Sequence, residues 1–410
     1  FIDIKCGEES FYSHWETDTI VVSNYSCNET GYESSRVRTS GGHYLEFDFG
    51  GQKSYARNSA VCGDVINADN TLTGDLINCS GSYAIAIQNN GKDFTLDCAG
   101  FTIDGNRGTT DGIYFQNGNN VTVKNCKIQE VEYGFLSWGN PRNSLIFNNT
   151  ISASARGIYF YDGDYLYMEN NSIIGNTIYN VTSYSGILVV RGYGFNISNN
   201  LIYDVDDYGI YNQYGRNHTI SNNRIENTTS TAGSGIRMYR GWNYTISKNN
   251  ITNVNDFGIR VESSNYSTID SNIIYDSSDD GILPYNGASF NLIKNNEVYG
   301  GAAYGIYLYS THTINNTIVN NSVHDNAAYG IAIGVWNANA GGYNLVANNS
   351  IYDNSNNGIF VNTHDTTIYN NDIYNNSANG IYVYRDTANQ IFPDKLNISH
   401  NRIYQNTQSG

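Results

Sequence analysis

Residues 258–281 read GIRVESSNYSTIDSNIIYDSSDDG, and this stretch decides the fold. Three short runs, 258–262, 267–272 and 273–276, alternate apolar and polar residues, and a polar connection follows them. Alternation with a period of two is typical of strands with one buried face, and runs of this length are too short for helices. The stretch therefore predicts three short strands within about 24 residues.

The same unit recurs along most of the 410-residue chain. A glycine followed by Ile, or once by Phe, marks each unit, and its spacing of 22 to 29 residues is that of a solenoid repeat. Such a unit buries its apolar face only by stacking on the next one, which predicts a parallel β-solenoid with Ile236, Ile259 and Ile282 in one inward column. The repeat glycines are at 112, 134, 157, 186, 209, 235, 258, 281, 305, 330, 358 and 380.

A second marker, the pair Asn-Asn, keeps step with the glycines. Asn tolerates left-handed backbone, and stacked amides bond from coil to coil, so we expect Asn at the coil corners. The pairs end at 149, 171, 200, 223, 250, 296, 321, 349 and 371, and the same position reads Ser-Asn at 271–272 and His-Asn at 400–401.

The chain resembles the right-handed parallel β-helix, or pectin-lyase-like, superfamily. The segment 62–105, with TLTGDLINCSG and FTLDCAGFTIDG, is similar to the opening coils of surface β-helix repeat proteins in its carbohydrate-binding and sugar-hydrolase group. The resemblance covers roughly residues 61–410 and implies the right hand. We therefore expect an all-β, right-handed parallel β-helix of about 12–15 coils, with opening coils at 61–111 and regular repeats at 112–410.

Residues 1–60 lack the repeat and alternate in strand-like runs, so we expect a small β-rich cap or docking element there. At the other end, the spacing places a further repeat glycine at Gly410. We expect either that the protein continues beyond it or that another element covers this coil.

Six cysteines lie in the first third of the chain and lack metal-site or redox spacing, which favours disulfides and an oxidising compartment. The pairings expected are Cys6 with Cys27, Cys62 with Cys79, and Cys98 with Cys126. The chain also carries 18 N-x-S/T sites among 63 Asn residues, which favours an extracellular or cell-surface glycoprotein. The glycosylation candidates are Asn24, Asn28, Asn120, Asn217, Asn243, Asn265 and Asn397.

Composition and charge exclude several classes of partner. The net charge of −16 disfavours nucleic acid, and no apolar run is long enough to span a membrane. The sequence shows no dinucleotide, Walker or zinc motif, so we expect no cofactor and at most weakly bound Ca²⁺ at the Asp-rich turns.

The sharpest catalytic candidate is the pair Asp279-Asp280, which resembles the paired aspartates of polygalacturonases. Asp256 holds the position of Asp279 one coil earlier, and Arg237 and Arg260 each follow a repeat glycine by two. The register predicts all five on one surface, able to hydrolyse a glycosidic bond or to hold Ca²⁺ while an Arg abstracts a proton. The His-Gly and Arg-Ile-Lys motifs of polygalacturonases are absent, which favours ordinary charge pairing over catalysis.

Tyrosines fall into two columns that are expected to point outward. Three roles remain open for them: they stabilise the coils by stacking on each other, form a protein–protein contact face, or bind sugar rings by stacking. His324 replaces a tyrosine of the first column, and His324 and His364 are each followed by Asp, as expected of surface histidines. The first column is Tyr203, Tyr275, Tyr299, Tyr352, Tyr374 and Tyr404, and the second is Tyr114, Tyr159, Tyr211, Tyr307 and Tyr382.

Two functions remain. The sequence favours a non-catalytic extracellular structural protein, a surface or filament subunit that self-associates head to tail by covering the coil ending at Gly410 with residues 1–60 of the next copy. The alternative is a polysaccharide lyase or glycoside hydrolase, or a glycan-binding adhesin or tailspike-type β-helix. Oligomer symmetry and cleavage of polysaccharides discriminate between them.

Overall fold

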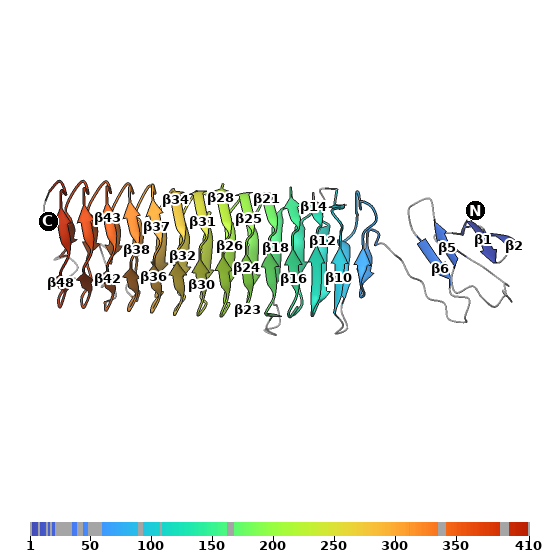
Figure 1. Cartoon of the computed structure of the whole chain (residues 1–410), viewed down its shortest axis with the longest axis horizontal. Helices are drawn as coiled ribbons and strands as arrows, with labels where there is room; N and C mark the ends of the chain where they lie inside the picture. The colour runs from blue at the N-terminus through green and yellow to red at the C-terminus, as the bar shows by residue number, and fades with distance from the viewer. Residues whose placement is uncertain are drawn as a thin grey trace.

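Each coil runs through three short strands, and the strands of successive coils pair in parallel to form three long sheets (Figure 1). The computed structural model describes residues 60–88, 93–106, 109–161, 168–310, 312–334, 342–385 and 393–408, together with six strands before residue 60. We name the sheets I, II and III in the order in which a coil beginning at its repeat glycine visits them. Over the described residues the sheets contain 14, 14 and 13 strands, which confirms the predicted all-β parallel solenoid.

Sheet I contains the Gly-Ile strands. They are β7 (Asp64–Ile66), β9 (Tyr83–Gln88), β12 (Asp111–Asn117), β15 (Tyr133–Ser137), β18 (Arg156–Tyr161), β22 (Ser185–Val190), β26 (Tyr208–Gln213), β29 (Ile236–Tyr239), β32 (Ile259–Glu262), β35 (Ile282–Tyr285), β38 (Ile306–Leu308), β41 (Ile331–Ile333), β44 (Ile359–Val361) and β47 (Ile381–Val383).

Sheet II follows in each coil. Its strands are β8 (Asn70–Thr71), β10 (Phe94–Asp97), β13 (Val121–Lys124), β16 (Leu145–Phe147), β20 (Ser172–Ile174), β24 (Asn196–Ser198), β27 (Thr219–Ser221), β30 (Thr245–Ser247), β33 (Thr268–Asp270), β36 (Leu292–Lys294), β39 (Thr317–Val319), β42 (Leu345–Ala347), β45 (Thr367–Tyr369) and β48 (Asn397–Ser399).

Sheet III completes the coil. Its strands are β11 (Thr102–Asp104), β14 (Lys127–Gln129), β17 (Thr150–Ser152), β21 (Thr177–Val181), β25 (Leu201–Val205), β28 (Arg224–Thr228), β31 (Asn250–Val254), β34 (Ile273–Ser277), β37 (Glu297–Tyr299), β40 (Ser322–His324), β43 (Ser350–Tyr352), β46 (Asp372–Tyr374) and β49 (Arg402–Tyr404).

The remaining strands form small pairs. β19 (Met168–Glu169) and β23 (Gly192–Tyr193) pair in parallel between sheets I and II. Before the solenoid, β1 (Ile2–Cys6) pairs with β2 (Glu9–Ser13), β3 (Trp15–Glu16) with β4 (Thr19–Ile20), and β5 (Ser35–Arg38) with β6 (Tyr44–Phe47), all antiparallel. That residues 1–60 form a cap or a docking element stays a prediction.

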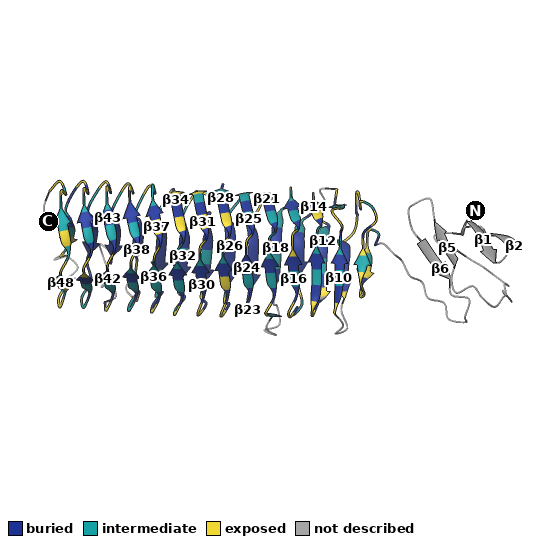
Figure 2. Ribbon diagram, in the orientation of Figure 1, coloured by how far each residue is buried: buried dark blue, intermediate teal, exposed yellow. Residues whose placement is uncertain are grey.

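The interior is a set of apolar columns, one residue per strand. Ile236 pairs with Ile259 and Ile259 with Ile282, and all three side chains are fully buried, which confirms the predicted column. Figure 2 shows the same arrangement along the whole solenoid, where buried residues follow the strands and exposed ones lie mainly at the connections. Dispersion and hydrophobic burial thus favour one register, because a slip would turn every apolar residue outward.

A buried asparagine ladder lines the corner between sheets II and III. In each coil the backbone N–H and the side-chain Nδ2 of one Asn both donate to Oδ1 of the Asn in the next coil, as Asn272 does to Asn296 at 2.9 Å. The Nδ2 group also donates to a strand carbonyl of the preceding coil, that of Ile246 at 2.9 Å. The ladder runs through Asn149, Asn176, Asn200, Asn223, Asn249, Asn272, Asn296, Asn321, Asn349, Asn371 and Asn401.

The ladder corrects the sequence-based position in two coils. The Asn-Asn pair ending at Asn171 precedes sheet II, and the ladder residue of that coil is Asn176 after Gly175. In the pair ending at Asn250, the first residue, Asn249, is the buried one. At the corner between sheets II and III, a residue with positive φ precedes each ladder Asn, and Gly175 and Lys248 fill that position in these two coils.

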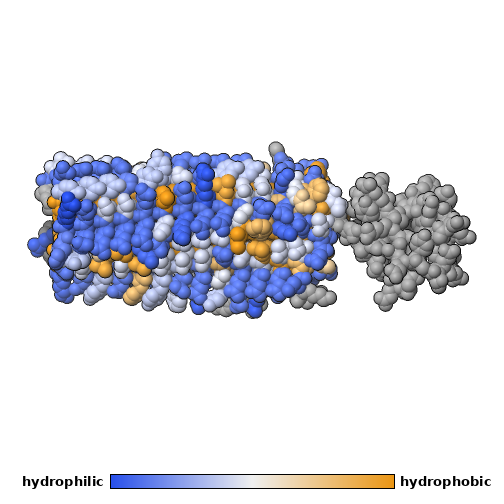
Figure 3. Space-filling model, viewed as in Figure 1, coloured by the Kyte–Doolittle hydropathy of each residue, from blue (hydrophilic) through white to orange (hydrophobic). Residues whose placement is uncertain are grey.

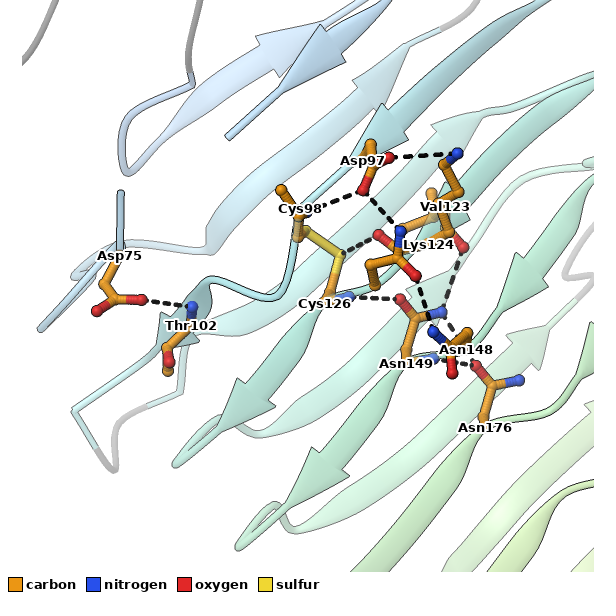
Figure 4. Close-up of a disulfide and its surroundings, with 12 residues drawn as sticks. Asp75, Asp97, Cys98, Thr102, Val123, Lys124, Cys126, Asn148, Asn149 and Asn176 are labelled. Atoms are coloured by element: carbon orange, nitrogen blue, oxygen red, sulfur yellow. Dashed lines mark hydrogen bonds and ion pairs between the residues drawn. A yellow bond between two sulfur atoms is a disulfide. The ribbon is translucent and has the colours of Figure 1, made fainter. Parts of the chain in front are cut away.

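Two disulfides reinforce the opening coils, and both were predicted. Cys62 bonds Cys79, and Cys98 bonds Cys126. Figure 4 shows that the second bond lies where the ladder begins, because the backbone N–H of Cys126 donates to Oδ1 of Asn149 at 2.9 Å. The predicted bond between Cys6 and Cys27 lies outside the described residues.

The repeat glycines are required by close approach between coils. A Cβ atom on Gly258 would lie 2.5 Å from the carbonyl oxygen of Gly281 and would also collide with the side chain of Ile274. A Cβ atom on Gly74 would meet no atom within 4 Å. Glycine therefore marks the repeat because the backbone of the next coil occupies the space of a side chain.

We expect Gly258→Ala to destabilise the solenoid by roughly 1–3 kcal/mol, the usual range for overpacking, because the extra methyl group forces the coils apart. Urea denaturation measures this loss, with Gly74→Ala as the matched control that changes stability little. Equal stability of the two variants would contradict the steric account.

Candidate active site

Three carboxyl groups lie at the connection that leads from sheet III into sheet I. Asp256 and Asp279 each precede a repeat glycine by two residues, and the backbone N–H of Asp279 donates to the carbonyl of Asp256 at 3.0 Å. Asp280 directly precedes Gly281. The register therefore places Asp256 and Asp279 side by side in adjacent coils, as the sequence predicted.

Asp280 is the buried member of this group. Its side chain is 3% exposed, and its Oδ1 accepts a hydrogen bond from the backbone N–H of Tyr304 at 3.1 Å. Burial, and then the charge of Asp279, raise the pKa of Asp280 to about 8. The raised pKa favours the protonated form of Asp280, and a side-chain hydrogen bond joins it to Asp279.

Asp256 and Asp279 are partly exposed and reach solvent. Burial and the charge of Asp279 raise the pKa of Asp256 to about 6, against the opposing effect of Arg260 and Arg237. Burial also raises the pKa of Asp279, while its hydrogen bond with Asp280 acts in the opposite direction. The group thus combines neighbouring carboxyls whose pKa values are raised to different extents, as in sites where one carboxyl serves as acid and another as base.

The two arginines are held in place beside these carboxyls. Arg237 on β29 and Arg260 on β32 both bind the same carboxylate oxygen, Oε2 of Glu262, at 2.8 and 3.1 Å. Glu262 itself is buried. The strand pairing aligns Arg237 with Arg260, which confirms their predicted outward column.

Aromatic rings further restrict both guanidinium groups. Arg237 lies 4.9 Å from the ring centre of Tyr211 and 5.2 Å from that of Tyr208. Arg260 lies 5.3 Å from the ring centres of both Phe257 and Tyr285. These contacts immobilise the arginines before any ligand binds.

Aromatic clusters flank the charged group along the outward face of sheet I. The first cluster comprises Leu188, Val190, Tyr208 and Tyr211 with Tyr159, Tyr161, Tyr184 and Tyr239 around them. The second comprises Leu283, Tyr307, Tyr329, Ala332 and Phe360 with Phe257, Tyr285, Tyr304 and Tyr384. Figure 3 shows on one side of the molecule how apolar residues gather in patches on a mainly hydrophilic surface.

The two tyrosine columns differ in their surroundings. On sheet III the rings stack on each other in an unbroken series from Tyr275 to Tyr404, with centroids 4.6 to 5.1 Å apart. His324 takes part, between Tyr299 and Tyr352, as a member of the stack. Because neighbouring rings cover each other's faces, this column stabilises the coils. Tyrosines of the second column, such as Tyr211 and Tyr307, belong to the clusters on sheet I.

The remaining sequence candidates lie away from this group. Nδ1 of His324 is 2.8 Å from Asp325, and Nδ1 of His364 is 2.8 Å from Asp365. Among the glycosylation candidates, Asn120, Asn217, Asn243 and Asn397 are exposed and Asn265 is partly exposed, while Asn24 and Asn28 lie outside the described residues. Within the described ranges, no three His, Cys, Asp or Glu side chains form a group able to hold a metal ion.

Sequence reasoning missed two features on sheet I. One is Glu262, which joins the two arginines. The other is a group at the opposite end of the first cluster, where Arg156 pairs with Glu132 at 3.1 Å. Beside it, burial and the charge of Glu132 raise the pKa of Asp111 to about 7. Asp111 directly precedes a repeat glycine, as Asp280 does, so this shared position was a usable signal.

We expect Asp280→Asn to stabilise the protein increasingly as pH rises from about 4 to about 8. The unfolded carboxyl ionises near pH 4, whereas the folded one keeps its proton to about pH 8, so ionisation opposes folding throughout this window. Denaturant unfolding at several pH values measures the difference. Asp207→Asn, at the position of Asp279 three coils earlier, is the control, and a pH-independent difference for Asp280→Asn would contradict the account.

Two family profiles match the sequence. The profile of the right-handed β-helix region matches residues 185–341 and 334–410, more than half of the chain. The profile of the periplasmic copper-binding protein NosD matches residues 50–180. A search of curated protein sequences gives no significant match.

Solved structures share the fold at low sequence identity. A double mutant of the periplasmic alginate epimerase AlgG is 13% identical with a TM-score of 0.53, and the match covers 83% of this chain and 78% of that one. Another AlgG structure is 15% identical, with a TM-score of 0.49 and the same coverage. The A-module of the Azotobacter vinelandii mannuronan C-5 epimerase AlgE4 is 13% identical with a TM-score of 0.46, over 85% and 89% of the two chains.

These findings also bear on location. Disulfides persist in oxidising compartments, so the two bonds in the opening coils indicate an extracellular or periplasmic protein. Among the residues that the structure describes, none forms a helix long and apolar enough to cross a bilayer.

Proposed function

The chain belongs to the right-handed β-helix family, and we propose that it binds a polysaccharide on the outward face of sheet I and hydrolyses it at Asp256 and Asp279. The observation that carries the proposal is the group of three carboxyls with raised pKa values, placed between two aromatic clusters. Carboxyls with perturbed pKa values gather at functional sites. Burial and neighbouring like charges lower stability, but they also bring the pKa of an acid or base to the value that catalysis needs.

The partly exposed carboxyls have complementary roles in this proposal. Asp256, whose pKa lies near 6, gives its proton to the glycosidic oxygen as the bond between that oxygen and the anomeric carbon breaks. Asp279 accepts a proton from the water whose oxygen bonds to the anomeric carbon. Asp280 is too buried to touch the sugar and acts as a positioning residue, which holds Asp279 through their side-chain hydrogen bond.

The flanking clusters supply the binding surface. The rings around each cluster, such as Tyr239 and Tyr285, are only partly buried, and packing against the buried rings holds them rigid. Little conformational entropy is therefore lost when a sugar ring stacks on them. The structural neighbours that act on alginate share this fold, and their names agree with a carbohydrate substrate. The non-catalytic filament subunit and its head-to-tail assembly stay predictions, as does a cell-surface position.

Reducing-end assays on a panel of neutral and acidic polysaccharides test the activity. We expect Asp256→Asn and Asp279→Asn each to lower the rate by about 10²-fold or more, as loss of a general acid or base does. Asp207→Asn, which changes the same charge at the same position of an earlier coil, keeps full activity. Absence of cleavage across the panel, or equal loss in the control, would overturn the proposal.

The pH dependence gives a separate test. Because Asp256 must be protonated to act as the acid, we expect the rate to fall as pH rises above about 6. Initial rates across this range, with folding followed by circular dichroism, measure the effect. A rate that rises steadily above pH 6 would exclude Asp256 as the acid.

A further inference from the structure

The corner between sheets I and II, over the coils that begin at Gly186, Gly209 and Gly235, gathers arginines and aromatic rings. Figure 1 places β23 at this edge of the solenoid. Bridges align Tyr193 with Arg216 and Arg216 with Trp242 in one column. A second column consists of the residues that directly follow the sheet I strands of the same coils. We call this surface the basic-aromatic corner, made of Arg191, Tyr193, Tyr214, Arg216, Arg240 and Trp242.

The second column adopts an unusual backbone. Arg191, Tyr214 and Arg240 have φ values of 64°, 55° and 52°, in the left-handed region. In later coils the same column contains Ser263 and Asn286, which are small residues. Long side chains in this region are uncommon and cost backbone energy, so their presence in three successive coils points to a role for the side chains.

The rings of the corner face solvent. Tyr193, Tyr214 and Trp242 are 42%, 41% and 50% exposed. The guanidinium group of Arg216 lies 5.1 Å from the ring centre of Trp242. The corner therefore presents flat apolar faces with cations beside them.

The charge of the corner contrasts with that of the whole chain, which is −16. Within the described part of the chain, neither Arg216 nor Arg240 forms an ion pair. Glu169, which aligns with Tyr193 in the first column, pairs with Arg142 at 3.9 Å. Glu262, one residue before Ser263 of the second column, pairs with Arg237 and Arg260. The exposed guanidinium groups of Arg216 and Arg240 are thus available to an anionic ligand.

The corner is continuous with the candidate active site. The ring centre of Tyr239 lies 5.7 Å from the guanidinium of Arg237 and 4.9 Å from that of Arg240. One aromatic ring thus joins the charged group on sheet I to the corner. A polymer that ran from the corner along the strands of sheet I, past Tyr239 and Arg237, would reach the carboxyls at the connection between sheets III and I.

We infer that the basic-aromatic corner binds an anionic polysaccharide, with guanidinium groups on its carboxylate or sulfate groups and rings on its sugar faces. This inference names the substrate class for the function proposed above and rests on it for the choice of a sugar polymer. Three arginines on a strongly acidic chain are few for nucleic acid, whose binding depends on many phosphate contacts.

Binding to pectate, alginate, chondroitin sulfate and a neutral glucan, measured by affinity electrophoresis at low and at high salt, tests the inference. We expect the double variant Arg216→Gln/Arg240→Gln to lose about tenfold or more in affinity for the anionic polymers at low salt, and nothing for the neutral one. Trp242→Ala, which keeps the charge, also weakens binding because it removes a stacking surface.

The matched control is Arg142→Gln/Arg224→Gln, which removes two arginines that already pair with Glu169 and Glu226. It keeps wild-type affinity. Equal affinity of the corner variant and the wild type would overturn the inference, as would duplex DNA binding as tightly with the same dependence on Arg216 and Arg240. Binding is also measured with Asp279→Asn, which removes a proposed catalytic group and leaves the basic-aromatic corner unchanged. Loss of cleavage and loss of binding at the corner are therefore distinguishable.

Discussion

Register between coils is the constraint on which the rest of this structure depends. The asparagine ladder imposes it, because each buried amide donates both to the next coil and to the preceding one, and buried polar groups need such partners. A slip by one residue would leave these groups unpaired, which costs more than the bonds contribute when made. The ladder thus aligns equivalent residues of successive coils in a straight column along the solenoid.

The alignment of equivalent residues in columns also explains how the candidate active site arises on a regular repeat. The position two residues before the repeat glycine is Ala155, Tyr184 or Gly233 in some coils and Asp in others. Where Asp256 and Asp279 occupy it in adjacent coils, the register forces two carboxyls together, and Asp280 adds a third. Burial and the repulsion between these carboxylates raise their pKa values. Both effects follow from the spacing of the coils and require no unusual backbone conformation.

Most of the fold could be predicted from the sequence because the residues that recur in the repeat each have a strict physical role. Glycine is needed where the next coil approaches, and isoleucine fills the interior, so both recur. The ladder was misplaced at Asn171 and Asn250 because Asn is common at several corners, and the corner at which it lies, rather than its identity, distinguishes the ladder residue. The sequence did not indicate the role of Glu262, because this role depends on arginines in its own coil and in the preceding one. Nor did it indicate the left-handed backbone of Arg191, Tyr214 and Arg240, because composition does not report backbone angles.

A crystal structure of the Asp279→Asn variant with an acidic oligosaccharide tests the central claim most directly. Loss of the carboxylate blocks turnover, while the aromatic clusters and the arginines remain. The account predicts sugar rings on the outward face of sheet I, with a glycosidic oxygen within hydrogen-bond distance of Asp256. An oligosaccharide bound only on sheet III, or none at concentrations that saturate the protein in solution, would contradict it.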